Sequence, residues 1–428
     1  MRDVLLAVVL LGASGCGQKT EPPPPGYTIE ATAGTRSALY AGDRALAADV
    51  LALSKAGGGT IRFSAGTFEF ATGLDVNQIR NVRFVGAKEG TVFRLRKLDD
   101  WGLIRTVGTQ PLDTKSLAVD RPELLRPGAP YQLFLPGRYP NRYVEMRVAA
   151  IADGKATLSS TVCTNPQAKE ISDGSYVVPQ LSVLDGFLIS GVSFTDIVFD
   201  GNVEDVKKVA LGGVNFAGHT THCGLLFRNS YRDQAKRPAA RDITIERCVF
   251  RGFLGRGFVV YNTDGVVIRD CRFERVRTEA LEIDHWCRDV RIESSSFAGA
   301  HVGLQLNDCN STVVENCAFE SCAIGVKIVD ALKDRTTNRG LTIRKSRFAK
   351  LGTGIEVPPF AEDNAIVDNV FESAGAVAIV VRGDKNTIAG NTVTGSAKAG
   401  VLLEGKECVV RDNAIAAPNG AADFKPIR

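Results

Sequence analysis

A short pattern of apolar and small residues recurs along the C-terminal half of the chain. In each copy an aliphatic residue is followed three positions later by Cys, Ser or Asn, and two positions after that by an apolar residue. The copies are Ile245/Cys248/Phe250, Ile268/Cys271/Phe273, Ile292/Ser295/Phe297, Val314/Cys317/Phe319, Ile343/Ser346/Phe348, Ile366/Asn369/Phe371, Ile388/Asn391/Val393 and Val410/Asn413/Ile415. Successive copies are 22 to 29 residues apart. Short apolar segments repeated at this distance predict a solenoid in which each copy is one coil.

A second apolar segment keeps the same spacing and begins each time with a small residue. These small residues are Gly224, Gly257, Ala280, Gly303, Gly325, Gly354, Ala378 and Gly400. Each coil is therefore expected to carry at least two strands, and strands at matching positions in successive coils are expected to pair.

The N-terminal part of the chain has a different pattern. Residues 44–56 are rich in alanine and leucine and predict a helix that ends at three glycines, and residues 60–63 predict a strand. Residues 142–151 and 155–162 predict a β-hairpin with its turn at residues 152–154. Because the repeat is lost between about residues 96 and 182, this stretch predicts a small inserted β subdomain.

The repeat resembles the right-handed parallel β-helix of the pectin-lyase-like superfamily. The resemblance depends on the Cys/Ser/Asn column from Cys248 to Asn413 and on the Phe column from Phe250 to Phe371. Leucine-rich repeats have similar lengths, but their leucine-dominated frame is absent. The resemblance implies an all-β, right-handed, single-stranded parallel β-helix, with the helix at residues 44–56 as an N-terminal cap. It specifies the fold far more strongly than the chemistry.

The first 16 residues have the pattern of a secretory signal. Arg2 precedes an apolar run that is too short to span a bilayer, and Ala-Ser-Gly-Cys follows. This end resembles a bacterial lipoprotein processing site, which implies a lipid on Cys16. By the same resemblance, Gly17 favours the outer membrane over the inner membrane. The protein is thus expected to be exported into the cell envelope and to meet the membrane only through this lipid.

These patterns divide the chain into six segments. We predict a lipoprotein-type signal peptide (residues 1–16), a proline-rich tether (17–33), an N-terminal cap with the first coils (34–95), an inserted β subdomain (96–182), regular β-helix coils (183–416) and a C-terminal tail (417–428).

Composition narrows the class of partner. The 428 residues carry a net charge of +4 without a long run of like charge, so no nucleic-acid partner is expected. The sequence also predicts no cofactor, no metal site and a monomer. No Cys-x-x-Cys pair occurs. Cys287 and Cys309 are expected on adjacent coils, close to the reach of a disulfide, but spacing alone does not establish a bond.

Polar residues gather on the predicted outward face of the middle coils. Two positions after each small residue the column reads Leu226, Val259, Glu282, Gln305, Lys327, Glu356, Val380 and Leu402, and four positions after it Arg228, Tyr261, Asp284, Asn307, Val329, Pro358, Arg382 and Glu404. The histidines are His219, His222, His285 and His301. Long connections at residues 228–242 and 330–340 leave the same strand end and are expected to wall this face.

The residue types on this face suit the recognition of an extended glycan. The candidate catalytic residues are Glu282, Asp284, His285 and Lys327, and the candidate substrate-binding residues are Arg228, Tyr261, Trp286, His301, Gln305, Asn307 and Asp308. Glu282 and Asp284 can act as the carboxyl pair of a glycoside hydrolase, in retaining or inverting geometry. Alternatively Tyr261, His285 or Lys327 takes a proton beside a uronate neutralised by Arg228, which gives elimination or epimerisation.

Two other interpretations stay open. The same polar residues are also what the solvated face of a non-catalytic surface protein requires, so a protein that only binds glycan, envelope or a protein partner is the competing class. Residues 262–265 match a tetrapeptide of polygalacturonase active sites, but the Asp pair, Gly-His-Gly and Arg-x-Lys that accompany it in that family are missing. Asp264 is therefore predicted to be a turn residue.

Overall fold

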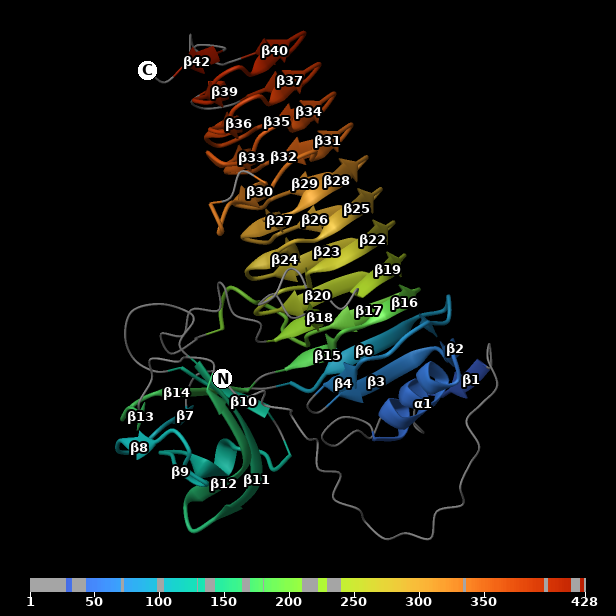
Figure 1. The fold of residues 1–428 in the computed structure, drawn as a ribbon, viewed down its shortest axis with the longest axis vertical. Helices are drawn as coiled ribbons and strands as arrows, with labels where there is room; N and C mark the ends of the chain where they lie inside the picture. The colour runs from blue at the N-terminus through green and yellow to red at the C-terminus, as the bar shows by residue number, and fades with distance from the viewer. Residues whose placement is uncertain are drawn as a thin grey trace.

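The computed structural model describes most of the chain and shows a solenoid with a subdomain beside its N-terminal coils (Figure 1). It describes residues 28–32, 44–70, 73–97, 104–128, 130–134, 143–163, 170–179, 181–209, 222–228, 240–333, 336–395, 399–416 and 424–426. The predicted signal peptide, Cys16 and His219 lie outside these residues. Among the described residues, no helix is long and apolar enough to cross a membrane.

Three long parallel sheets form the solenoid. The first sheet has the order β1 (Thr28–Ala31), β2 (Gly59–Phe63), β5 (Val82–Val85), β16 (Ser190–Thr195), β19 (Ala240–Glu246), β22 (Thr263–Arg269), β25 (Arg288–Glu293), β28 (Asn310–Glu315), β31 (Thr342–Arg344), β34 (Ala365–Val367), β37 (Thr387–Ala389) and β40 (Val409–Arg411).

The second sheet contains the small-residue strands. Its order is β4 (Leu74–Asn77), β15 (Ser182–Phe187), β18 (Cys223–Arg228), β21 (Phe258–Tyr261), β24 (Glu279–Asp284), β27 (Val302–Asn307), β30 (Ile324–Val329), β33 (Thr353–Val357), β36 (Val377–Val381), β39 (Ala399–Leu403) and β42 (Phe424–Pro426).

The third sheet connects the other two within each coil. Its order is β3 (Gly66–Phe70), β6 (Thr91–Leu95), β17 (Ile197–Asp200), β20 (Val249–Phe253), β23 (Arg272–Val276), β26 (Ser296–Ala298), β29 (Ala318–Glu320), β32 (Arg347–Ala349), β35 (Val370–Glu372), β38 (Thr392–Thr394) and β41 (Ala414–Ala416). A regular coil therefore runs from the first sheet to the third and then to the second, which confirms the predicted parallel β-helix.

The corner between the first and third sheets explains the Cys/Ser/Asn column. The residue before the column is in the left-handed region, for example Asn316 (φ 54°) and Asp368 (φ 56°), which turns the chain sharply. The column side chains then bond along the solenoid. The backbone N–H of Ser346 donates to Asn369 Oδ1, and the N–H of Asn369 donates to Asn391 Oδ1, both at 3.0 Å. This ladder satisfies buried backbone groups that no strand partner reaches.

The predicted Phe column forms a continuous stack inside the solenoid. Phe273, Phe297 and Phe319 are stacked with ring centroids 5.0 and 4.8 Å apart, and all three are buried. A Cβ atom on Gly303 would lie 2.8 Å from the Phe319 ring and 2.7 Å from the Gly325 carbonyl oxygen. A small residue therefore stands at or next to the start of each second-sheet strand of the regular coils, because the aromatic stack fills that corner.

The N-terminal cap forms as predicted. Helix α1 (Arg44–Lys55) ends one residue earlier than the sequence pattern suggests. It buries Leu46, Val50 and Leu53 completely, and it contacts the first strands of the solenoid. The helix thus covers core that the terminal coil of a repeat protein would otherwise expose.

The inserted subdomain is antiparallel. Its main sheet has the order β7 (Ile104–Arg105), β14 (Tyr176–Pro179), β10 (Pro130–Phe134), β11 (Tyr143–Ala152), β12 (Lys155–Cys163) and β9 (Ser116–Ala118); β13 (Glu170–Ile171) pairs with β8 (Gln110–Pro111), and η1 (Pro122–Leu124) is a single 3-10 turn. Strands β11 and β12 are the predicted hairpin. Arg147 donates to Asp75 Oδ2 at 3.2 Å and joins this subdomain to the solenoid.

Seven cysteines of the described coils are buried inside the solenoid, and Cys408 is half-buried. Cys248, Cys271 and Cys317 are buried, as the repeat predicts. Cys287 and Cys309 occupy neighbouring coils, but both are free thiols rather than a disulfide. The Cys309 thiol donates instead to the backbone carbonyl oxygen of Ile283 at 3.0 Å. The Cys287 thiol donates to the backbone carbonyl oxygen of Asp284 at 3.1 Å.

Candidate functional site

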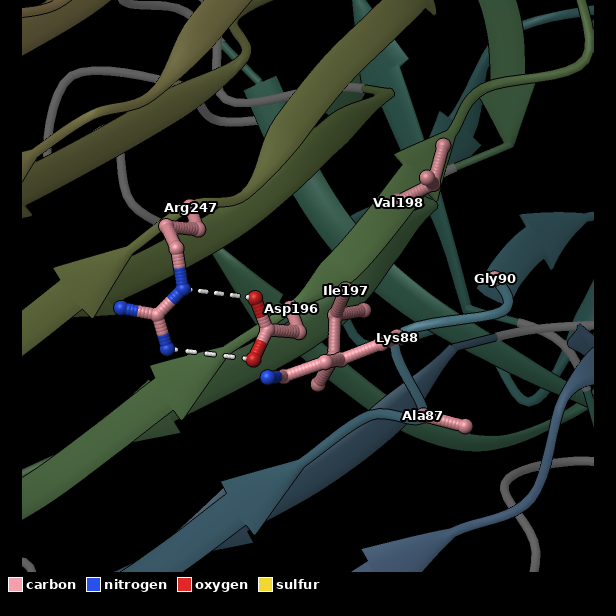
Figure 2. Close-up of a pocket in the computed structure, with 7 residues that line it drawn as sticks. All are labelled: Ala87, Lys88, Gly90, Asp196, Ile197, Val198 and Arg247. Atoms are coloured by element: carbon pink, nitrogen blue, oxygen red, sulfur yellow. Dashed lines mark hydrogen bonds and ion pairs between the residues drawn. The ribbon is translucent and has the colours of Figure 1, made fainter.

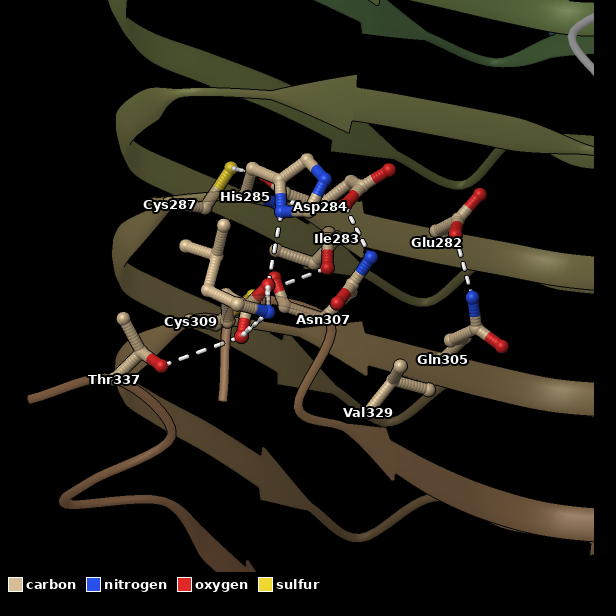
Figure 3. A network of polar contacts seen from close by, with 12 residues as sticks. Glu282, Ile283, Asp284, His285, Cys287, Gln305, Asn307, Cys309, Val329 and Thr337 are labelled. Carbon is tan, nitrogen blue, oxygen red and sulfur yellow. Dashed lines mark hydrogen bonds and ion pairs between the residues drawn. The ribbon is translucent and has the colours of Figure 1, made fainter. Parts of the chain in front are cut away.

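The outward columns predicted from the sequence are adjacent in the second sheet. Glu282 of β24 pairs with Gln305 of β27, which pairs with Lys327 of β30. Tyr261 of β21 pairs with Asp284. The polar side chains drawn in Figure 3 therefore come from three successive coils and from the turns that follow their strands.

Glu282 is not the exposed carboxylate that an open strand face suggests. It is only 2% exposed and contacts Arg256, whose side chain is 3% exposed. Gln305 Nε2 donates to its other oxygen at 2.5 Å. Burial raises the pKa of Glu282 to about 8, against the lowering effect of Arg256.

Arg256 and Glu279 were not among the predicted site residues. Arg256 Nε lies 3.3 Å from Glu279 Oε2, so one buried guanidinium faces two carboxyl groups. The pKa of Arg256 is raised because the charges of Glu282 and Glu279 outweigh the effect of its burial. A signal did exist: Arg256 and Glu279 each stand one position before the small residue of their coil.

Asp284 lies at the centre of a second group of contacts. It is 5% exposed, and its Oδ1 accepts hydrogen bonds from Asn307 Nδ2 at 2.6 Å and from the backbone N–H of His285 at 2.8 Å. The Tyr261 hydroxyl also donates to it. Burial nevertheless raises the pKa of Asp284. Asn307 Oδ1, which is buried, meets no hydrogen-bond donor among the described residues.

His285 is held by the carboxylate of the next coil. Its Nδ1 lies 3.0 Å from Asp308 Oδ2, while 22% of the side chain stays exposed. Burial lowers the pKa of His285, but the hydrogen bond with Asp308 and the charge of Asp284 raise it more, so the net pKa is above its ordinary value. Asp308 itself is fully buried.

An extra residue in one turn places His285 at the site. In neighbouring coils the residue after the second-sheet strand is already left-handed, as in Asn262 (φ 43°) and Asp308 (φ 50°). After β24 the left-handed residue is Trp286 (φ 60°), and His285 stands between it and Asp284. The sequence signal is the 24-residue step from Ile268 to Ile292, against 23 before it and 22 after it.

Two aromatic rings border His285. The centroid of the Tyr261 ring lies 6.5 Å and that of the Trp286 ring 5.6 Å from the centroid of the imidazole. Burial raises the pKa of Tyr261 well above its ordinary value, and the charge of Asp284 adds to this, so the phenol stays neutral. The site thus combines a neutral phenol with an imidazole held at one nitrogen.

Two of the predicted residues lie apart from this network, and a third lies at its border. Arg228 donates to Asp185 Oδ2 at 2.7 Å, so its charge is already paired. His301 is exposed and precedes β27, at the opposite end of the strand from Asn307. Lys327 is half-buried next to Gln305, and no described residue forms an ion pair with it.

Two further predictions concern the long connections beside the site and Asp264. Of the two long connections, residues 229–239 lie outside the described part of the chain. The connection at residues 330–340 reaches Asp308, which accepts from the Leu332 N–H at 3.2 Å and from Thr337 Oγ1 at 3.3 Å. The prediction that Asp264 is a turn residue was wrong, because Asp264 lies in strand β22, next to Arg288 of β25. It is not a free catalytic group, because it forms an ion pair with Arg288 at 2.7 Å.

His222 has a structural role. It is 1% exposed, and its Nδ1 accepts a hydrogen bond from the Leu254 N–H at 2.9 Å. Burial lowers the pKa of His222 to about 3, so the ring is neutral.

Two surface hollows lie elsewhere on the solenoid. One, of about 420 Å³, lies between Lys88 and the pair formed by Asp196 and Arg247 at the corner of the first and third sheets (Figure 2). Arg247 Nε donates to Asp196 Oδ1 at 2.7 Å, which largely neutralises this hollow. The other, of about 750 Å³, lies between Arg80 and Arg241.

Two family descriptions match the coils. Residues 197–358 match "Right handed beta helix region", and residues 334–422 match "Periplasmic copper-binding protein (NosD)". No curated protein sequence matches the chain.

Solved structures resemble this fold over nearly its whole length. The A-module of a mannuronan C-5 epimerase from Azotobacter vinelandii has a TM-score of 0.50 at 15% identity, over 93% of this chain and 100% of that one. A protein described as a glycoside hydrolase has a TM-score of 0.52 at 12% identity, over 92% of this chain and 97% of that one. The sheets and the matches together define a parallel β-helix protein. The chain therefore has the fold of a right-handed parallel β-helix, and residues 197–358 also match that family in sequence.

The segment that matches the second description lacks the side chains that bind copper. Copper in proteins is bound by imidazole, thiolate and thioether groups. Residues 334–422 contain one cysteine, Cys408, and neither histidine nor methionine. The Cys408 thiol has a raised pKa because of burial, and it donates to the Gly383 carbonyl oxygen at 3.4 Å. Across the described residues, no group of three His, Cys, Asp or Glu side chains is placed to hold a metal ion.

Proposed function

We propose that this protein binds a polysaccharide on the outward face of β21 to β30 and processes it by proton transfer at His285. The observation that carries the proposal is the His285–Asp308 pair, 3.0 Å apart, with the imidazole still partly exposed. Within the network His285 combines a fixed orientation with access from solvent, as does the half-buried Tyr261 on the adjacent coil. Glu282 and Asp284 are both almost completely buried.

The contacts of His285 favour a role in acid–base chemistry. Because Nδ1 is held by Asp308, Nε2 is the nitrogen that exchanges a proton with a ligand. The neutral Tyr261 hydroxyl lies on the adjacent coil and donates to Asp284. One group that takes a proton and a second that returns one are the requirements for removing hydrogen from a sugar carbon.

The sugar expected at this site carries a carboxylate. Proton removal is feasible at the carbon next to a uronate carboxyl group once a cation neutralises that group. Lys327 suits this role because no described residue forms an ion pair with it, whereas Arg228 already pairs with Asp185. After the C–H bond breaks, either the adjacent C–O bond breaks and the leaving oxygen takes a proton, or the same carbon is reprotonated on its opposite face. The first course is elimination and the second is epimerisation.

Hydrolysis is a second candidate. It is supported by the pKa of Glu282, about 8, because a protonated carboxyl group is the general acid of a glycosidase. In that mechanism Asp284, two residues away on β24, is the second carboxyl group. This mechanism requires the buried ion pair between Arg256 and Glu282 to separate before Glu282 can protonate a substrate, and separating a buried ion pair is energetically unfavourable.

A non-catalytic glycan-binding protein is the remaining alternative. It requires the polar face, Trp286 and the half-buried Gln305, but it does not require the orientation of His285 by Asp308. The epimerase and glycoside hydrolase structures that share this fold support a polysaccharide ligand in general, without selecting a reaction.

The site of action is proposed to be the bacterial cell envelope. The match to a periplasmic family supports export, and Cys16 is proposed to carry a lipid that holds the protein at the outer membrane. The six segment boundaries predicted from the sequence, from residues 1–16 to 417–428, remain part of this proposal.

The test is a screen of the purified protein against uronate-containing and neutral polysaccharides. Ultraviolet absorbance of unsaturated products reports elimination, new reducing ends report chain cleavage, and proton NMR in D2O reports exchange or epimerisation. His285→Ala is expected to abolish product formation while binding persists, and His301→Ala serves as the matched control on an exposed histidine. Products made equally by both variants would refute catalysis at His285. Binding without any product would favour the non-catalytic alternative.

A further inference from the structure

The hollow of about 750 Å³ lies on the same edge of the solenoid as His285. Its lining includes Gln78 and Leu188, which are left-handed residues in the turns from the second sheet to the first. The Leu188 N–H donates to the Arg228 carbonyl oxygen at 3.1 Å, and Arg228 ends the strand next to β21. Trp286, beside His285, occupies the corresponding turn further along this edge.

The register of the first sheet sets the separation. Arg241, which lines the hollow, pairs with Asp264, and Asp264 pairs with Arg288. Arg288 follows His285 by three residues. Because neighbouring coils are about 4.8 Å apart, the end of the hollow at Arg241 is separated from His285 by roughly 10 Å along the edge, and the end at Arg80 by roughly 20 Å.

The charges in the hollow are not satisfied within the described part of the chain. Arg80 forms no ion pair there. Arg241 lies 3.6 Å from Asp242, and both side chains are about two-thirds exposed, at 67% and 69%. An exposed pair at this distance contributes little and leaves the guanidinium able to bind another anion. Other arginines on this solenoid are held more closely, such as Arg288, 2.7 Å from Asp264.

The polar groups of the hollow suit a carboxylated sugar. Two guanidinium groups bind carboxylates in fixed planar geometry. The exposed Gln78 amide can exchange hydrogen bonds with hydroxyl groups. Arg80 and Asn81 stand on the backbone of a turn whose N–H groups are held by Ser54 Oγ at 2.7 Å and by the Ser190 carbonyl oxygen at 2.9 Å. The hollow is therefore built on a fixed backbone.

We propose that this hollow is a binding site for carboxylate groups of an acidic polysaccharide, and that the bound chain extends from it along the turn edge to His285. The inference rests on the proposed function for the identity of the processed sugar. It adds that the ligand is polyanionic and long enough to span several coils. Neutral glycans and short acidic oligosaccharides do not use the hollow.

The test compares Arg80→Ala/Arg241→Ala with the control Arg62→Ala/Arg272→Ala. Both variants remove two exposed arginines, and Arg272 also has a carboxylate partner, the half-buried Glu274, at 3.3 Å. Binding is measured to polygalacturonate, alginate and neutral dextran at fixed salt. The hollow variant is expected to bind the two carboxylated polymers about tenfold more weakly. The control is expected to change by less than twofold, and dextran binding is expected to be the same for all proteins.

The outcomes separate this inference from the proposed function. If wild type turns over a polyuronate, the hollow variant should raise the KM for long chains and leave kcat and short-chain KM unchanged. If wild type turns over no polysaccharide but its binding of polyuronate still depends on Arg80 and Arg241, the carboxylate-binding site is supported and the proposed function is refuted. The proposed carboxylate-binding site is refuted if both variants lose polyuronate affinity equally, or if wild type does not bind polyuronate.

Discussion

Asp308 Oδ2 lies 3.0 Å from His285 Nδ1, and this contact joins two neighbouring coils at the edge of the second sheet. The same carboxylate accepts hydrogen bonds from the Leu332 N–H and from Thr337 Oγ1. Asp308 therefore connects the orientation of the imidazole to the loop at residues 330–340. A substitution at Asp308 should change the orientation and the pKa of His285, even though the two residues lie on different coils.

Asp308→Asn should lower the pKa of His285. The negative charge and the hydrogen bond of Asp308 raise that pKa, whereas burial lowers it, so removing the charge leaves burial dominant. NMR titration of the four histidines measures the shift directly. Product formation is expected to fall at least tenfold, with its acidic limb displaced to lower pH. Asp264→Asn, at the exposed pair with Arg288, is the control; an unchanged His285 titration in Asp308→Asn would contradict the assignment.

Glu282→Gln should protect the protein at alkaline pH. The folded pKa of Glu282 is about 8, above its ordinary value of 4.5, so the stability it contributes is fully present below pH 4.5 and is lost as the pH rises through 8. Between pH 5 and pH 8, wild type should lose about 3 kcal/mol relative to the variant. Thermal unfolding at a series of pH values measures this. Glu372→Gln, at an exposed pair with Arg347, should leave the pH profile unchanged.

His222→Asn should make the folded protein less sensitive to acid pH, whereas Glu282→Gln should make it less sensitive to alkaline pH. The folded pKa of His222 is about 3, below its ordinary value of 6.5, so its contribution is complete above pH 6.5 and is lost as the pH falls toward 3. Wild type should lose about 2 kcal/mol relative to the variant between pH 7 and pH 5. Unfolding midpoints at the two pH values test this. Parallel pH profiles for the two proteins would mean that His222 is not buried in the neutral form.

Phe297→Ala should destabilise the solenoid more than any exposed substitution. Phe297 is stacked between Phe273 and Phe319 and is fully buried, so truncation leaves a cavity that costs about 3–5 kcal/mol. Val370→Ala, at a residue 39% exposed, should cost less than about 1 kcal/mol. Chemical denaturation measures both. Similar unfolding midpoints for the two variants would show that the aromatic stack is not continuous in solution.

The repeat in the sequence predicted the fold because a coil has a fixed length. Once the step between coils is about 23 residues, positions such as Glu282 and Gln305 must pair, and the column of small residues must face the aromatic stack. The helix at the N-terminus and the hairpin in the insertion were also predictable, since their signals are local. The 24-residue step at Ile268 contained the signal for His285, but only the backbone conformation identified the extra residue.

What the sequence by itself determined is the parallel β-helix, its interior ladders and the set of residues that share an outward column. The tertiary structure decided which of those residues work together. It buried Glu282 against Arg256, paired Arg228 with Asp185, separated His301 from the network and joined His285 to Asp308. The physical reason is that strand periodicity fixes the side of the sheet on which a side chain lies. Its charge partner and its exposure depend on side chains from other coils, whose directions no spacing along the chain specifies.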